Sequence, residues 1–199
     1  MRRINKRNTL DKLSKEIILI SSIFIVFVII GSLLNKIFPQ YTDIINENIA
    51  YTANYYEGNV SIGDVVLSNF KQDFLILFLM ATCTTSIILS PVALVIFLVK
   101  GLSIGYTINS FIIAMKFGSI KLIFITLIKF LILLPGMIIL ALISIKYFSE
   151  IIGEIKKKNK INYKYFVKRY LINSSIIITI TILGQAILNT IYVATLQIF

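Results

Sequence analysis

The chain has 199 residues, of which 57% are hydrophobic and 15% charged, and its mean hydropathy is +0.89. These values lie well above those of an ordinary water-soluble domain, so the sequence predicts an integral membrane protein. It contains no histidine, no tryptophan and one cysteine, which argues against disulfides and against metal sites built from histidine or cysteine. We therefore expect no cofactor.

Positive charge is in excess, with 20 lysines and arginines against nine acidic residues and a formal net charge of +11. In a soluble chain this excess would suggest binding to nucleic acid. Here the basic residues lie between apolar runs, where they orient a membrane protein and contact lipid headgroups. We expect membrane lipids as partners and no nucleic acid. The isoleucine-rich, alanine-poor composition is typical of the AT-rich genome of a low-GC Gram-positive bacterium.

Five apolar runs could cross a membrane as helices. The third run, with 14 residues, is short, and the fourth is interrupted only by Lys129 and contains Pro135. The sequence predicts an all-α integral membrane protein, a five-span helical bundle that forms a single polytopic domain. The predicted spans are residues 17–34, 74–99, 102–115, 122–145 and 171–199.

The basic segments decide the orientation of these spans. The N-terminal segment is basic and precedes a run without a convincing cleavage site, which indicates an uncleaved signal anchor. Five crossings place Lys100 and the basic loop 146–170 in the cytosol, whereas four crossings would translocate that loop. The positive-inside rule therefore favours five crossings, a cytosolic N-terminus and an extracytoplasmic C-terminus. Lys100 would snorkel, so that the third helix can begin some residues earlier.

The outer loop 35–73 is the only sizeable extracytoplasmic segment, and it carries five acidic residues and four tyrosines. Residues 61–70 are predicted to form a short amphipathic helix that leads into the second span. The tyrosines could simply anchor the loop at the membrane boundary, or they could form a docking surface for a partner. Both interpretations remain open. The docking candidates are Tyr51, Tyr55, Tyr56 and Glu57.

A second amphipathic segment lies in the basic cytosolic loop. Its apolar residues follow helical spacing, and its lysines and arginine occupy the opposite side. This pattern predicts a helix lying at the inner leaflet, where basic residues also attract anionic lipid. The apolar residues are Tyr163, Phe166, Val167, Tyr170 and Leu171.

Catalysis inside the membrane is not expected. The chain has no histidine to activate a nucleophile, and all nine acidic residues lie outside the five apolar runs. That distribution also argues against a carboxylate site for proton or sodium coupling. A Ser-Lys pair with Lys129 remains formally possible, but no particular serine is indicated. Lys129 could instead snorkel to the outer headgroups, or pair with an outer-loop acid, a partner protein or a lipid phosphate.

Small and weakly polar residues repeat at helical spacing in three spans, which predicts faces that contact other helices. Those helices could belong to the same bundle or to a partner protein. Pro91 and Pro135 are each predicted to kink a helix. The three faces consist of Thr82, Ser86 and Ser90; Gly101, Gly105 and Asn109; and Thr181, Gln185 and Asn189.

Residues 89–107 read Leu-Ser-Pro-Val-Ala-Leu-Val-Ile-Phe-Leu-Val-Lys-Gly-Leu-Ser-Ile-Gly-Tyr-Thr. This stretch resembles the stage II sporulation protein M family, in which a proline-containing second span runs into a Lys-Gly-x-x-x-Gly-x-Thr segment at the start of the third. The matching residues are Lys100, Gly101, Gly105 and Thr107, and Pro135 matches a proline of the fourth span. The order of basic and apolar segments is similar over most of the chain. Family members engaged in sporulation often carry Pro-Gln-Asn where this chain has Ile-Lys-Phe at 128–130, so the resemblance is to a divergent member.

The resemblance implies a non-enzymatic membrane scaffold. Such a scaffold would hold two peptidoglycan hydrolases, stage II sporulation proteins D and P, at the septum during thinning and engulfment. The alternative is the membrane subunit of an ABC-type exporter with a separate ATPase subunit, because this chain has no phosphate-binding loop of its own. An unpartnered stress or immunity protein is a third possibility.

Overall fold

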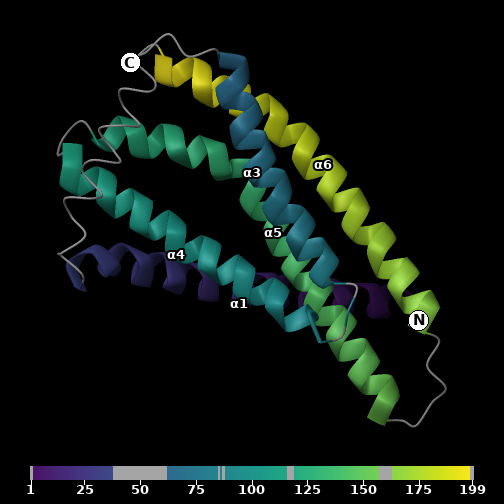
Figure 1. Cartoon of the computed structure of the whole chain (residues 1–199). Coiled ribbons are helices and arrows are strands. Elements are labelled where there is room, and N and C mark those ends of the chain that lie inside the picture. The colour runs from purple at the N-terminus through teal and green to yellow at the C-terminus, as the bar shows by residue number, and fades with distance from the viewer. Residues whose placement is uncertain are drawn as a thin grey trace.

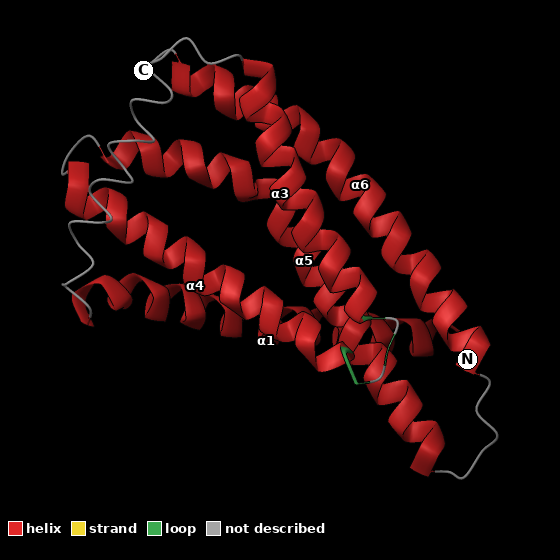
Figure 2. Ribbon diagram, in the orientation of Figure 1, coloured by secondary structure: helices red, strands yellow, loops and turns green. Residues whose placement is uncertain are grey.

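The structure is a computed structural model that describes residues 2–37, 62–84, 86, 88–115, 119–156 and 163–197. In these residues every regular element is an α-helix (Figure 2). The all-α class is confirmed for the described residues, and all five helices are long and apolar enough to cross a membrane. They are α1 (Arg2–Ile37), α3 (Ile62–Cys83), α4 (Ser90–Met115), α5 (Ser119–Lys156) and α6 (Tyr163–Gln197).

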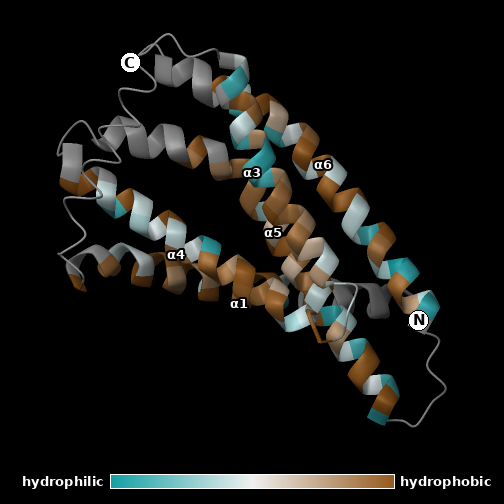
Figure 3. Cartoon of the chain, in the orientation of Figure 1, coloured by the Kyte–Doolittle hydropathy of each residue, from teal (hydrophilic) through white to brown (hydrophobic). Residues whose placement is uncertain are grey.

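The helices run along one another, with their ends gathered at two ends of the bundle (Figure 1). α1 packs mainly along α4, whereas α6 packs along α3 and α5. α5 also contacts α4 and therefore joins the two groups. The starts of α1, α4 and α6 lie toward the same end as the finishes of α3 and α5. Hydrophilic positions are frequent where α5 finishes and α6 begins (Figure 3).

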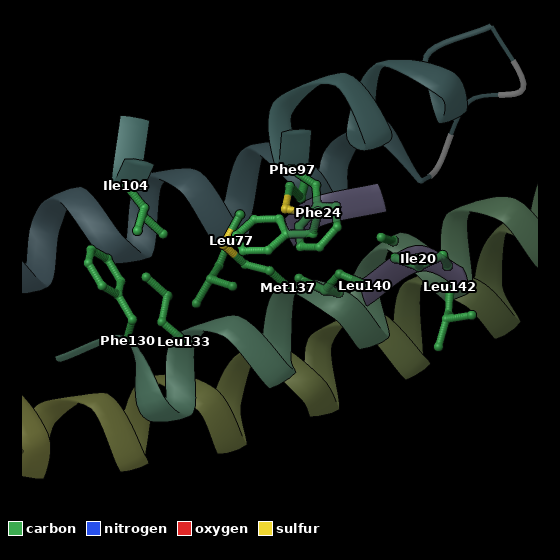
Figure 4. Close-up of a cluster of buried hydrophobic side chains, with 12 residues drawn as sticks. Ile20, Phe24, Leu77, Phe97, Ile104, Phe130, Leu133, Met137, Leu140 and Leu142 are labelled. Atoms are coloured by element: carbon green, nitrogen blue, oxygen red, sulfur yellow. The ribbon is translucent and has the colours of Figure 1, made fainter. Parts of the chain in front are cut away.

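The core is a continuous cluster of apolar side chains from four helices (Figure 4). Phe24 of α1 stacks on Phe97 of α4 with ring centroids 4.6 Å apart. Leu77 of α3 and Met137 and Leu140 of α5 are fully buried in the same cluster. Many large apolar side chains instead point outward from the bundle, as expected for helices surrounded by lipid.

Glycines allow α1 and α4 to cross at close range. A Cβ atom at Gly105 would collide with the backbone of Val28, and one at Gly31 would collide with the backbone of Leu102. Gly101 lies against the Phe24 ring. The predicted glycine face of the third span therefore contacts a helix of the same chain, as small residues commonly do in membrane bundles.

The boundary between the second and third spans differs from the prediction. The sequence placed it at Lys100, between spans 74–99 and 102–115, but α3 already ends at Cys83 and α4 runs unbroken from Ser90. Lys100 therefore lies within α4 and not in a cytosolic connection. A helix keeps a lysine inside an apolar run when other helices supply contacts for its charge, and sequence spacing alone does not reveal those contacts.

Two further predictions change with this boundary. Pro91 lies in the first turn of α4, where a missing backbone N–H leaves no intrahelical bond unmade, so it does not kink the second span. Thr82, Ser86 and Ser90 do not share one helix face, because α3 ends between the first two. Pro135, by contrast, lies inside α5, which changes direction along its length as the proline predicts (Figure 1).

The amphipathic segment at 163–171 is the start of α6 and not a separate helix at the lipid surface. Tyr170 is buried against Tyr147 of α5, with ring centroids 5.0 Å apart, and Phe166 joins them beside Ile151. This part of the apolar face is therefore covered by α5. The Arg169 guanidinium lies 3.4 Å from the Glu150 carboxylate and adds a pair between the same two helices.

The close crossing of α1 and α4 is testable with a single methyl group. Gly105→Ala should destabilise the protein by about 1–3 kcal/mol, because the new Cβ forces two backbones apart. Gly153→Ala in α5 is the matched control, since no atom lies within 4 Å of its Cβ position. Thermal unfolding of the purified protein in detergent measures both. Equal melting temperatures for the two variants would contradict the crossing.

Candidate functional site

A carboxylate is buried inside the bundle. Asp73 is only 3% exposed and lies in the part of α3, residues 66–83, that is apolar enough to span a membrane. The sequence had assigned Asp73 to the outer loop, and the expectation that no acidic residue enters the spans is therefore wrong. A charged aspartate at the centre of a membrane helix costs about 2.5–3.5 kcal/mol on insertion scales, so its surroundings must compensate.

Two amides of α6 compensate the carboxylate directly. Gln185 donates from Nε2 to Oδ2 of Asp73 at 3.1 Å, and Asn189 donates from Nδ2 to the same oxygen at 3.3 Å. Gln185 Nε2 also lies 3.5 Å from Asn189 Oδ1. Both amide side chains are at most 1% exposed. Hydrogen bonds to a charged acceptor are about twice as strong as neutral ones, so this contact holds α3 firmly against α6.

A positive charge lies on a third helix. The Lys100 side chain of α4 is half-buried. Its Nζ lies 5.4 Å from the centroid of the Phe130 ring on α5, a cation–π geometry. The carboxylate and the ammonium group therefore both belong to apolar parts of the helices that are long enough to span a membrane. We call Asp73, Lys100, Gln185 and Asn189 the polar centre.

Sequence reasoning found part of this centre. The spacing of Thr181, Gln185 and Asn189 predicted one shared face of the last span, and all three side chains are buried on it. The face contacts a helix of the same chain and not a partner helix. Asp73 was missed because the predicted span 74–99 is an uncharged run that begins directly after it. Extending the predicted amphipathic helix 61–70 into the following apolar run would have placed Asp73 within a helix.

Hydroxyl groups fasten the connection between α3 and α4. Ser90 and Ser144 bond reciprocally, each hydroxyl donating to the other residue's carbonyl, at 2.8 and 2.7 Å, with the two Oγ atoms 2.8 Å apart. Thr84 Oγ1 lies 3.1 Å from Ser174 Oγ of α6. All four residues are buried. These hydrogen bonds therefore hold the connection against α5 and α6. Polar side chains commonly form such bonds between the helices of membrane bundles.

The remaining candidates take separate places. Thr107 bonds the carbonyl of Ser103 in its own helix, and Asn109 is partly buried, its Nδ2 atom without a hydrogen bond to any described atom. Pro135 is exposed on α5. Lys129 lies in α5, but its side chain is outside the described part of the chain. The docking candidates Tyr51, Tyr55, Tyr56 and Glu57 lie outside the described residues.

The polar centre holds charged groups in an apolar interior and links α3 to α6. The link follows from a buried carboxylate that accepts hydrogen bonds from two amides. Comparisons with protein-family models, with curated proteins and with solved structures found no match. The function must therefore be inferred from the chemistry of the chain itself.

Removing one amide donor tests the polar centre. Gln185→Leu takes a hydrogen bond from the Asp73 carboxylate and should lower stability by about 1–3 kcal/mol. Thr190→Val is the control, because Thr190 is exposed on the same helix and bonds only its own helix backbone, so about 0.5 kcal/mol or less is expected. Thermal unfolding in lipid nanodiscs measures the difference. Loss of stability in both variants alike would refute the special role of Gln185.

Proposed function

We propose that the chain is a non-enzymatic scaffold in the cell membrane. The supporting observation is that polar groups within the spans contact one another. Asp73 binds Gln185 and Asn189, and Ser90 binds Ser144. Such contacts hold α3 against α6 and α4 against α5, and a scaffold requires helices in a fixed arrangement. The apolar core between them is packed with side chains that are fully buried, which supports an anchor more than a passage.

The proposed orientation places the N-terminus in the cytosol and the C-terminus outside. Basic residues gather where α5 finishes and α6 begins, and the exposed ones include Lys156, Lys164, Lys168 and Arg169. Cytoplasmic segments of bacterial membrane proteins are enriched in such residues. The same residues would contact anionic headgroups at the inner leaflet.

The proposed partners are extracytoplasmic proteins, by resemblance the peptidoglycan hydrolases called stage II sporulation proteins D and P. The face of Gly101 and Gly105 is covered by α1, so it is not free for a partner helix. This leaves the outer loop, with Tyr51, Tyr55, Tyr56 and Glu57, as the proposed docking surface. Tyrosines suit this role because aromatic residues are enriched among interface hot spots.

A second candidate function is the membrane subunit of an ABC-type exporter. The observation in its favour is the polar centre, because ionisable residues within membrane helices often mark transport paths. Asp73 and Lys100 supply such charges, which the sequence had not placed inside the bundle. An ATPase subunit would then be the partner at the basic end.

Reporter fusions test the orientation. Fusions at residue 158 and at Ile88, in the short connection between α3 and α4, should report a cytosolic location. A fusion at residue 55 should report an external one. Alkaline phosphatase and a fluorescent protein that folds only in the cytosol give opposite signals at each site. An external signal at residue 158 or a cytosolic signal at residue 55 would reverse the proposed topology.

Affinity purification tests the partner. Changing Tyr55, Tyr56 and Glu57 together to alanine should reduce recovery of the hydrolases about tenfold or more, while the amount of scaffold in the membrane stays normal. Lys164→Ala with Lys168→Ala is the control, because these exposed residues belong to the start of α6, which lies at the end of the bundle away from the finish of α1 and the start of α3 (Figure 1).

The same purification separates the two candidate functions. It is carried out on sporulating and on vegetative cells. Recovery of an ATPase from both, with no hydrolase from either, would replace the scaffold by the exporter. Full hydrolase recovery with the outer-loop variant would place docking elsewhere on the chain.

A further inference from the structure

We propose that the exposed side of α4 next to Lys100 binds a membrane-spanning helix of a partner protein, and that this helix carries an aspartate or a glutamate within the membrane. The inference goes beyond the docking surface proposed for the outer loop and does not depend on it. It rests on a positive charge in the middle of a candidate span, on the lack of an ion pair for that charge among the described residues, and on the exposed helix face beside it.

The depth of Lys100 decides which kind of anion can pair with it. Lys100 stands halfway along the candidate span Ser90–Ser110, about 15 Å along the helix from either end. Lipid phosphates lie outside the hydrocarbon core, which is about 30 Å thick, and a lysine side chain is too short to reach them from the middle. Ionisable residues at this depth are rare and usually pair with an opposite charge. A side-chain carboxylate within the membrane is therefore a better partner than a lipid headgroup.

The described part of the chain compensates the Lys100 charge only in part. Ion pairs join α5 to α1 and to α6, but no described carboxylate forms one with Lys100. The carboxylate of Asp73 is hydrogen-bonded to the amides of Gln185 and Asn189. The Phe130 ring contacts the ammonium group from one side only. Because the Lys100 side chain is half-buried, it is also partly open to a molecule outside the bundle.

An exposed face of α4 lies beside this charge. The contacts of α4 with α1 use glycines that lie on another side of the helix. Val95 and Val99 are 56% and 54% exposed, and Lys100 lies at the edge of their face. The exposed α4 face consists of Val92, Val95, Val99 and Ser103, which follow one another at helical spacing. Lipid tails can cover this face but bring no charge to Lys100, whereas a helix with a carboxylate supplies both the apolar contact and the counter-charge.

A model helix tests this chemistry without knowledge of the natural partner. The probe is a synthetic membrane-spanning peptide of leucine and alanine with one central glutamate, and its control peptide has leucine at that position. The purified full chain and either peptide are placed in phosphatidylcholine vesicles, and energy transfer between labels on the two measures their association. The glutamate peptide should bind at least about tenfold more tightly than the control peptide.

Variants of the chain assign the preference to Lys100. Lys100→Met should abolish the preference for the glutamate peptide, whereas Lys100→Arg should keep it because the charge remains. Lys71→Met is the matched control, since Lys71 is an exposed lysine near the start of another candidate span, and it should also keep the preference. If Lys100→Met fails to fold, Val99→Trp still tests the site. It leaves the charge in place, and its bulky ring on the exposed α4 face should weaken binding of the glutamate peptide about tenfold.

Three results would overturn the proposal. The first is equal binding of the two peptides to the wild type, and the second is an unchanged preference in Lys100→Met or unchanged binding to Val99→Trp. The third is loss of the preference when phosphatidylglycerol is added to the vesicles, because Lys100 would then belong to a lipid phosphate. None of these results bears on the outer loop, which the recovery of hydrolases tests separately.

Discussion

A charge inside an apolar bundle has to be compensated by other residues, and this constraint explains how α3 packs on α6. The Asp73 carboxylate requires the amides of Gln185 and Asn189, which fixes α3 against α6. Lys100 places a second charge within the bundle, on α4, where its ammonium group lies against the Phe130 ring of α5. α1 packs closely on α4 through glycines, so the position of α1 depends on the position of α4. The apolar core then fills the remaining space.

Contacts between hydroxyl groups likewise satisfy buried polar groups at the start of α4. Ser90 and Ser144 satisfy each other's backbone carbonyls, and Thr84 meets Ser174. Further along α5, Tyr147 contacts the ring of Tyr170 and joins α5 to α6. Amide–carboxylate hydrogen bonds, hydroxyl pairs and an aromatic contact therefore hold different parts of the bundle together, which supports the proposed scaffold role.

The sequence predicted the helices better than it predicted their contacts. Length and hydropathy identified five spans, and helical spacing identified the faces of Gly105 and Gln185, because these are local properties of one helix. The boundary at Lys100 and the position of Asp73 depend on pairing between helices far apart in sequence. A lone charge in an apolar run looks like a break in the span until its partner is known. The spacing of residues within one helix does not identify the residue of another helix that contacts the charge.

The central claim is that Lys100 lies inside the bundle and that the short connection before Ser90 lies at its surface. Cysteine accessibility tests it most directly, in a Cys83→Ala background that removes the native thiol. In opened membranes a water-soluble maleimide should label Ile88→Cys rapidly, since Ile88 is 85% exposed, and label Lys100→Cys at least about tenfold more slowly. Equal labelling rates at the two positions would contradict the account, because Lys100 would then lie in water between two helices.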